Sequence, residues 1–254
     1  MQPFTVVTGI AVPLLRDDVN TDQITPINRD INPDWAALLF AHARKRSDGS
    51  DDPDFPLNRP QFRRPSILIT GRNFGCGSSR EGAVWAMLAT GIRCIVARGF
   101  ADIYRENCLQ NGLLPIELRG ADSDAFEARV LAADGAAPFT VDLAAQTISG
   151  PGGGPIAFDI AAADRARLLE GLDDIGLTLK HAQQIAEWEE RTRERCPWLQ
   201  SATDSRRWSG RLPPPLAGEG WGGGAATSSQ YAAGSPPARS LRSRPPPHSA
   251  RRRA

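Results

Sequence analysis

Short apolar runs and helical patterns alternate along the first 200 residues of this 254-residue chain. Because strands that alternate with helices usually pair in parallel, and because a hairpin is expected near residues 150–154, the pattern predicts an α/β domain with a mixed sheet and outer helices. The runs typical of strands cover residues 5–11, 66–70, 93–97, 113–118, 139–142, 147–149 and 156–160. The helical patterns cover residues 35–44, 81–90, 102–110, 122–133, 161–170 and 180–193.

Residues 201–254 follow neither period and differ in composition. They contain three proline clusters and a glycine run, with nine arginines against two acidic residues, a local charge of +7. Since the whole chain carries +1, residues 1–200 carry −6. The composition predicts one domain over residues 1–200 and a disordered Pro/Gly/Arg-rich tail over residues 201–254. The tail arginines allow a nucleic-acid contact, but without interleaved aromatic residues we expect a solvated extension and no nucleic-acid partner.

The sequence shows no targeting segment, no membrane span and no metal-binding motif. The first 15 residues show no basic leader, and no run of 18 or more apolar residues occurs, so we expect a cytoplasmic protein that does not enter a membrane. Cysteines 76, 94, 108 and 196 and histidines 42, 181 and 248 have no spacing typical of a zinc or redox site. We therefore expect no metal bound by this chain.

Candidate chemistry gathers in residues 71–82, which read GRNFGCGSSREG and connect a predicted strand to a predicted helix. The helix is expected to begin on Ser78 and Ser79. Its first turn would leave backbone N–H groups unpaired and carry the positive end of the helix dipole, which favours a bound anion. Arg80 adds a planar guanidinium that matches a carboxylate.

Two nucleotide-binding motifs are excluded by spacing. Arg80 stands where a dinucleotide fingerprint requires its third glycine, and no Gly-Lys-Ser/Thr follows the glycines. A plain strand-to-helix turn with a serine cap would also explain the glycines and one serine. Two hydroxyls and a guanidinium together exceed what a cap needs, which favours a functional anion site.

The loop and several further segments resemble the small subunit of bacterial 3-isopropylmalate dehydratase, a member of the aconitase superfamily. The matching segments are residues 12–14, 18–24, 71–81, 94–97, 100–103, 111–115 and 171–179. Aconitases proper share the Gly-Ser-Ser-Arg-Glu core but lack the ending at residues 171–179, so the resemblance points to the leucine-pathway branch. It implies the swivelling β/β/α domain of the aconitase C-terminal type.

The resemblance also implies a hydro-lyase that interconverts 2-isopropylmalate and 3-isopropylmalate in leucine biosynthesis. Ser78 would take the C–H proton, and Arg80 would pair with a substrate carboxylate in a bidentate fork. Ser79 would donate a hydrogen bond to the ionised Ser78 oxygen or to a substrate carboxylate. Further candidates for substrate binding or for supporting the site are Thr21, Asp22, Arg29, Asn73 and Gly77. For Asp22 an Asx-type turn is an equal alternative, for Asn73 a loop brace, and for Arg29 a solvated loop position.

The superfamily uses a [4Fe-4S] cluster held by three cysteines as the Lewis acid for hydroxyl departure. This chain lacks the three-cysteine set. The resemblance therefore implies that the cluster is held by a separate large subunit, with which this chain forms an obligate heteromer around a small hydroxy-dicarboxylate substrate.

Two departures from the family pattern leave other functions open. Gly82 replaces the usual histidine, and the stretch from Ile27 to Phe40 differs from the usual form. A related hydroxy-diacid, such as a citramalate, a dimethylmalate or a homoaconitate-like acid, remains an alternative substrate. A noncatalytic anion-binding or assembly module is an alternative of another class.

Overall fold

The protein was analysed as a computed structural model, which describes residues 1–27, 30, 33–78, 80–196 and 198. Residues Met1–Trp198 form one compact unit. The tail predicted over residues 201–254 lies outside the described residues. No helix in the described part of the chain is long and apolar enough to cross a membrane.

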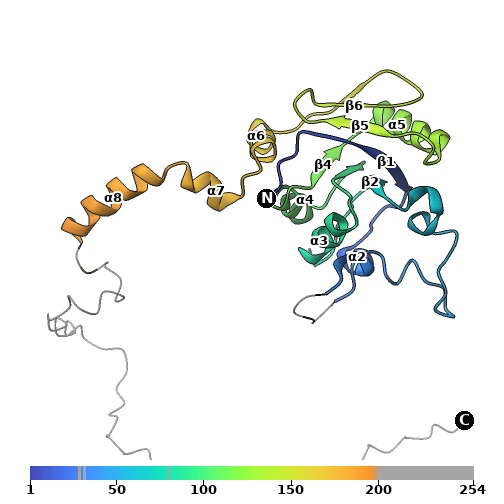
Figure 1. The fold of residues 1–254 in the computed structure, drawn as a ribbon, viewed down its shortest axis with the longest axis horizontal. Helices are drawn as coiled ribbons and strands as arrows, with labels where there is room; N and C mark the ends of the chain where they lie inside the picture. The colour runs from blue at the N-terminus through green and yellow to red at the C-terminus, as the bar shows by residue number, and fades with distance from the viewer. Residues whose placement is uncertain (28–29, 31–32, 79, 197, 199–254) are drawn as a thin grey trace, which may run out of the picture. The chain divides into compact units, whose positions relative to one another are not determined.

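A seven-stranded mixed sheet forms the centre of the domain, in the order β4-β3-β2-β1-β5-β6-β7 (Figure 1). The first four strands pair in parallel, and β5, β6 and β7 extend the sheet from β1 in antiparallel pairing. The predicted mixed sheet is thus confirmed. The strands are β1 (Val6–Leu14), β2 (Pro65–Thr70), β3 (Cys94–Ala97), β4 (Leu114–Glu117), β5 (Phe139–Asp142), β6 (Thr147–Ser149) and β7 (Ile156–Ala157).

Helices connect the parallel strands and follow the last antiparallel strand. Two short 3-10 helices, Pro56–Asn58 and Pro60–Phe62, precede β2. The α-helices are α1 (Thr21–Ile24), α2 (Trp35–Leu38), α3 (Gly82–Ala89), α4 (Asp102–Asn111), α5 (Gly120–Ala133), α6 (Ala162–Glu170), α7 (Asp174–Leu179) and α8 (Ala182–Arg195).

Alternate residues of the parallel strands enter two separate hydrophobic clusters, one on each face of the sheet. Leu68 of β2 and Ile95 of β3 join the cluster that contains Met87 of α3. Their neighbours Ile67 and Val96 join the cluster that contains α5 and α6 residues. Because side chains alternate along a strand, the apolar residues 67–69 of β2 and all four residues of β3 are buried on both faces of the sheet.

Three helices differ from the sequence-based prediction. The helical pattern over residues 81–90 agrees with α3, but the helix begins at Gly82 and not on Ser78 and Ser79, and its N-cap Glu81 makes no side-chain cap hydrogen bond. The predicted helix over residues 35–44 is regular only over α2, after which the chain continues in turns. Helix α7 was not predicted, since six residues with Gly176 among them give little helical periodicity.

The carboxyl-terminal ends of the parallel strands β1, β2 and β3 lie side by side, and the loops that follow these strands meet there. In open α/β sheets, ligands bind at the carboxyl ends of parallel strands. The loop after β2 is the glycine-rich stretch of the sequence, and we call residues 71–81 the serine loop.

Candidate active site

Main-chain hydrogen bonds hold the serine loop between the loops that follow β1 and β3. The amide of Gly75 donates to the carbonyl of Val19 at 2.8 Å, and the amide of Phe74 donates to the carbonyl of Gly99 at 3.0 Å. Isolated parallel bridges join Asn20 to Cys76 and Phe74 to Phe100. The three loops therefore continue the parallel pairing of their strands for a few residues, which gives the serine loop a defined path.

Two glycines are required by this close packing. A Cβ on Gly71 would lie 2.1 Å from Oδ1 of Asp17. A Cβ on Gly75 would lie 2.1 Å from the ring of Tyr104, and Gly75 has a φ of +78°. Since a side chain at either position would overlap its neighbour, these glycines fix how deeply the loop sits in the domain.

Two carboxylates that follow β1 brace the start of the serine loop. Asp17 accepts a hydrogen bond from the amide of Arg72 at 2.7 Å, and Asp18 accepts one from Nδ2 of Asn73 at 2.8 Å. Asn73 adopts a φ of +53°, a conformation that asparagine tolerates better than most residues. The structure thus gives Asn73 the bracing contact, while a substrate contact for its exposed side chain stays a prediction.

Arg80 is oriented by two acceptors from the segment that follows β1. Its Nη2 forms an ion pair with the carboxylate of Asp22 and donates to the carbonyl of Thr25 at 2.8 Å. These partners lie at the two ends of α1, whose start is fixed by a capping box between Asn20 and Gln23. The structure therefore brings together Asp22 and Arg80, which the sequence separates by 58 positions.

The remaining donors of Arg80 are its Nη1 and its Nε. Nε is buried and has no hydrogen-bond partner in the described part of the chain. Because the ion pair and the carbonyl contact use both N–H groups of Nη2, two-point pairing with a substrate carboxylate requires Asp22 to share or release Nη2. The predicted bidentate contact thus depends on Asp22.

The other predicted site residues differ in solvent exposure. Ser78 and Gly77 are exposed, and Gly77 has a φ of +85°. Thr21 is fully buried, and its Oγ1 has no hydrogen-bond partner among the described residues. This places Thr21 behind the site surface. Ser79 and Arg29 lie outside the described residues.

A polar link connects the start of α3 to the end of α4. Nδ2 of Asn111 donates to Glu81 at 2.8 Å, and its Oδ1 accepts from Nε1 of Trp85 at 3.0 Å. Glu81 directly follows Arg80 in the serine loop. Asn111 therefore anchors the end of the serine loop on the helix that follows β3.

Gly82, at the first position of α3, faces the ring of Trp35. A Cβ on Gly82 would lie 2.9 Å from Cζ3 of Trp35. The Trp35 ring also contacts the Trp85 ring edge-on, with 5.1 Å between centroids. The absence of a side chain at position 82 thus leaves room for the Trp35 ring of α2.

We expect Gly82→Ala to lower the free energy of unfolding by about 1–3 kcal/mol, because the Trp35 ring must move away from the new Cβ. In a Trp35→Ala background the same change should instead stabilise the protein, by up to about 1 kcal/mol, because alanine is the better helix former. Urea unfolding of the four proteins measures both effects. A stabilising Gly82→Ala in both backgrounds would show that the ring does not occupy this space.

The described cysteines do not suit an iron–sulfur cluster. Cys94 and Cys108 are fully buried, and burial raises the pKa of both thiols well above the usual range. Cluster ligands are thiolates, which such burial disfavours. No group of three or more histidine, cysteine, aspartate or glutamate side chains in the described part of the chain is arranged to hold a metal ion.

Several supporting residues were missed by sequence reasoning. The Asn20 and Gln23 capping box follows a recognisable spacing and could have been found. Asp17, Thr25, Trp35 and Asn111 act through contacts with distant parts of the chain, and nothing in their local sequence signals those contacts.

Comparison with known proteins places this geometry in a family. Residues 1–121 match the Aconitase C-terminal domain, residues 127–162 match LeuD_N, and residues 174–202 match the C-terminal domain of the 3-isopropylmalate dehydratase small subunit. The 3-isopropylmalate dehydratase small subunit of Azorhizobium caulinodans is 45% identical over 203 residues, which cover 78% of this chain and 100% of that protein. The same protein of Brucella canis is 46% identical over 202 residues, with the same shares covered. A crystal structure of 3-isopropylmalate dehydratase from Methanocaldococcus jannaschii aligns with a TM-score of 0.51 at 25% identity, over 72% of this chain and 99% of that chain.

Proposed function

The chain belongs to the family of 3-isopropylmalate dehydratase small subunits, and we propose that its serine loop supplies the proton-transfer and carboxylate-binding half of that enzyme's active site. The enzyme is a hydro-lyase of leucine biosynthesis, which interconverts 2-isopropylmalate and 3-isopropylmalate by dehydration and rehydration. The observation that carries the proposal is the ion pair between Arg80 and Asp22. Arg80 lies two residues after Ser78, whose side chain is exposed.

The reaction makes separate chemical demands on the site. A weakly acidic C–H proton must be removed, a hydroxyl must leave, and two carboxylates must be held while both events occur. We assign the first demand and one carboxylate to this chain, because its serine loop carries a hydroxyl at Ser78 and a guanidinium two positions later at Arg80.

We assign the proton transfer to Oγ of Ser78. A serine hydroxyl is a poor base in water, so its ionised form needs stabilisation from nearby positive charge and N–H donors. Arg80 supplies the charge. The start of α3 at Gly82 adds the positive end of the helix dipole, although the amides of its first turn already donate to the carbonyls of Arg80 and Glu81. Ser79 is assigned a hydrogen bond to the Ser78 oxygen on sequence grounds.

We assign one substrate carboxylate to Arg80. Its contacts with Asp22 and the Thr25 carbonyl fix the guanidinium before substrate arrives, which lowers the conformational entropy lost on binding. Asn73 and the backbone of Gly77 border the same exposed surface and are assigned to substrate contacts, with Arg29 as a further carboxylate ligand. Thr21 is assigned a supporting role beneath the loop.

We place the Lewis acid on a separate large subunit. The cysteines of this chain do not fit a cluster, so the [4Fe-4S] cluster that polarises the departing hydroxyl would be held by the partner. The active enzyme is then a heteromer with its substrate between the two chains. We place it in the cytoplasm, where reducing conditions keep the four free cysteines unpaired.

Anaerobic turnover of 2-isopropylmalate tests the proposal directly. We expect activity when this chain is mixed with the cluster-loaded large subunit from the same source, and none from either chain alone. Citramalate, dimethylmalate and homoaconitate are assayed in parallel. Far faster turnover of one of these acids would overturn the substrate, and a mixture that forms no complex would overturn the partnership.

A further inference from the structure

Exposed apolar side chains are concentrated in the last described helices. Among the described residues, five of the eleven large hydrophobic side chains that are exposed lie between residues 174 and 198. Ile175 and Leu179 of α7 are 69% and 61% exposed, and Trp188 of α8 is 58% exposed. We call α7 and α8, residues 174–195, the C-terminal arm. Its apolar density is far above that of the rest of the described surface.

Helix α8 has one apolar face without a partner among the described residues. Ile185 and Trp188 are three positions apart and lie on that face together with Ala182. Every α8 residue whose side chain is described is exposed or, for Thr192, partly exposed. Helices of 14 residues gain most of their stability from packing such a face. The pattern therefore indicates that α8 packs against another molecule.

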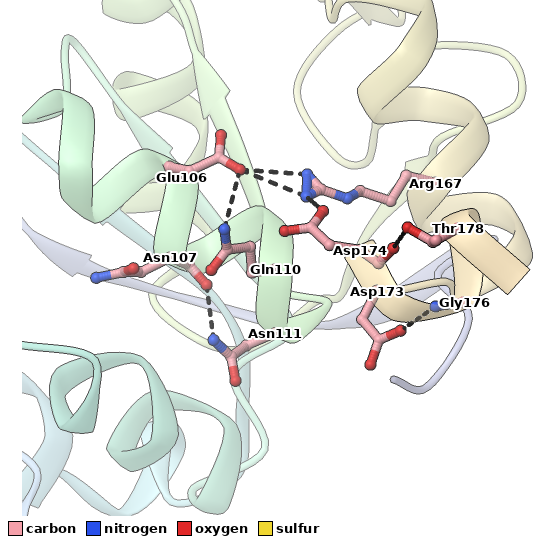
Figure 2. Close-up of polar contacts among 9 residues, drawn as sticks. All are labelled: Glu106, Asn107, Gln110, Asn111, Arg167, Asp173, Asp174, Gly176 and Thr178. Atoms are coloured by element: carbon pink, nitrogen blue, oxygen red, sulfur yellow. Dashed lines mark hydrogen bonds and ion pairs between the residues drawn. The ribbon is translucent and has the colours of Figure 1, made fainter. Parts of the chain in front are cut away.

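The base of the arm is fixed to the domain by a buried arginine. Arg167 of α6 is 8% exposed and pairs with Asp174 at 2.7 Å and with Glu106 of α4 at 3.2 Å (Figure 2). Asp173 caps α7 by accepting from the amide of Gly176 at 2.7 Å. Since α6, α4 and α7 meet at one guanidinium, the start of the arm is held in a defined direction.

A hollow adjoins the base of the arm at Asp173, and its lining contains no residue of the arm itself. It has a volume of about 460 Å³, and its lining includes Arg93, Asn111 and Asp173. Figure 2 shows Asn111 on α4 and Asp173 at the start of α7. Charged and amide groups at the rim of an apolar surface are typical of protein–protein interfaces.

The family matches indicate what covers the arm. The Aconitase C-terminal domain match ends at residue 121, whereas the arm lies within the match to the C-terminal domain of the 3-isopropylmalate dehydratase small subunit. The arm thus belongs to the part of the chain matched as specific to a separate small subunit, which must be held to its partner without a covalent link.

The area of the arm is of the right size for such an interface. Complete burial of a tryptophan removes about 150–250 Å² from water, and Trp188, which is 58% exposed, still has somewhat more than half of its surface to bury. Together with three aliphatic side chains, it accounts for a large share of the roughly 800 Å² that each partner contributes to a stable interface. We propose that the C-terminal arm docks on the large subunit through Ile175, Leu179, Ile185 and Trp188. This inference rests on the proposed function, because it takes its partner from it.

Binding to the isolated large subunit, measured by titration calorimetry, tests the arm. We expect Trp188→Asp to weaken binding by about 30-fold or more, as for a central interface tryptophan. The matched control is Gln183→Asp, which places the same charge on the opposite face of α8 and should leave binding unchanged. Thermal melting of the unbound variants should match that of the wild type, because Trp188 is exposed.

The outcomes separate the arm from the proposed function. If the wild type binds the large subunit and Trp188→Asp binds equally well, the arm inference is wrong and the partnership stands. If the wild type itself does not bind, the partnership proposed above is wrong. Sedimentation of this chain alone tests a third outcome. If the chain self-associates and only Trp188→Asp abolishes that association, while binding to the large subunit is unchanged, the arm makes contacts between copies of this chain. That result would overturn the inference.

Discussion

Ser78→Ala is expected to lower kcat of the assembled enzyme by about 100- to 10,000-fold, the range typical of losing a group that transfers a proton in the transition state. KM should change little, because the guanidinium of Arg80, which we propose binds a substrate carboxylate, remains. The exposed position of Ser78 means that its loss leaves no buried cavity, so the free energy of unfolding should stay within about 0.5 kcal/mol of the wild type. Steady-state kinetics with saturating large subunit measure the effect.

Two controls make the Ser78 result specific. Ser149→Ala removes a hydroxyl from β6, remote from the serine loop in the sheet order, and should leave kcat unchanged. Binding of the Ser78→Ala chain to the large subunit should equal that of the wild type. Retention of more than about a tenth of kcat would exclude Ser78 as the group that takes the proton, since even the low end of the expected range is larger.

Arg80→Lys is expected to raise KM by roughly 10- to 150-fold, which corresponds to losing a charged hydrogen bond of about 1.5–3 kcal/mol. Lysine keeps the positive charge but has one nitrogen in place of the guanidinium fork. It cannot contact Asp22, the Thr25 carbonyl and a substrate carboxylate in the same geometry. The change to lysine therefore separates the contribution of the planar guanidinium geometry from the contribution of the positive charge.

The split between KM and kcat tests how Arg80 acts. A large rise in KM with a small change in kcat supports carboxylate binding. A fall in kcat with KM unchanged would contradict carboxylate binding and leave Arg80 only its other proposed role, which is to stabilise the ionised Ser78 oxygen. The matched control is Arg46→Lys, because Arg46 lies in the segment before β2 and pairs at 3.6 Å with Asp52, far along the chain from the serine loop.

The alternation of apolar runs was sufficient to locate the strands along the chain, though not their order in the sheet, and the runs expected over residues 5–11 and 156–160 differ from β1 and β7 at their ends. The expected runs over residues 139–142 and 147–149 coincide with β5 and β6, and the run over residues 66–70 differs from β2 by one residue. These elements are short, continuous or alternating apolar segments bounded by turns. Their local pattern reflects burial directly, so their place in the sequence carries the information needed.

The helical pattern over residues 81–90 located α3, but the local sequence did not show that Ser78 and Ser79 lie outside the helix. Two serines before an alanine-rich stretch are a strong helix-start signal, and the helix was therefore expected to begin on them. In the fold, Gly77 takes a positive φ, and the Arg80 side chain is held by Asp22 and Thr25. Tertiary contacts thus hold Ser78 in an exposed loop and delay the helix to Gly82.

The sequence by itself determined the succession of strands along the chain, the glycine-rich loop and the residue types proposed for the chemistry, because each of these depends on neighbours a few positions away. Only the tertiary structure decided that Asp22 holds Arg80, that Trp35 fills the space above Gly82, and that Arg167 fixes the base of an exposed arm. The Asp22 and Trp35 contacts join residues tens of positions apart, and Arg167 joins α6 to α4 and α7. Such contacts depend on how strands and helices pack, which no local pattern encodes.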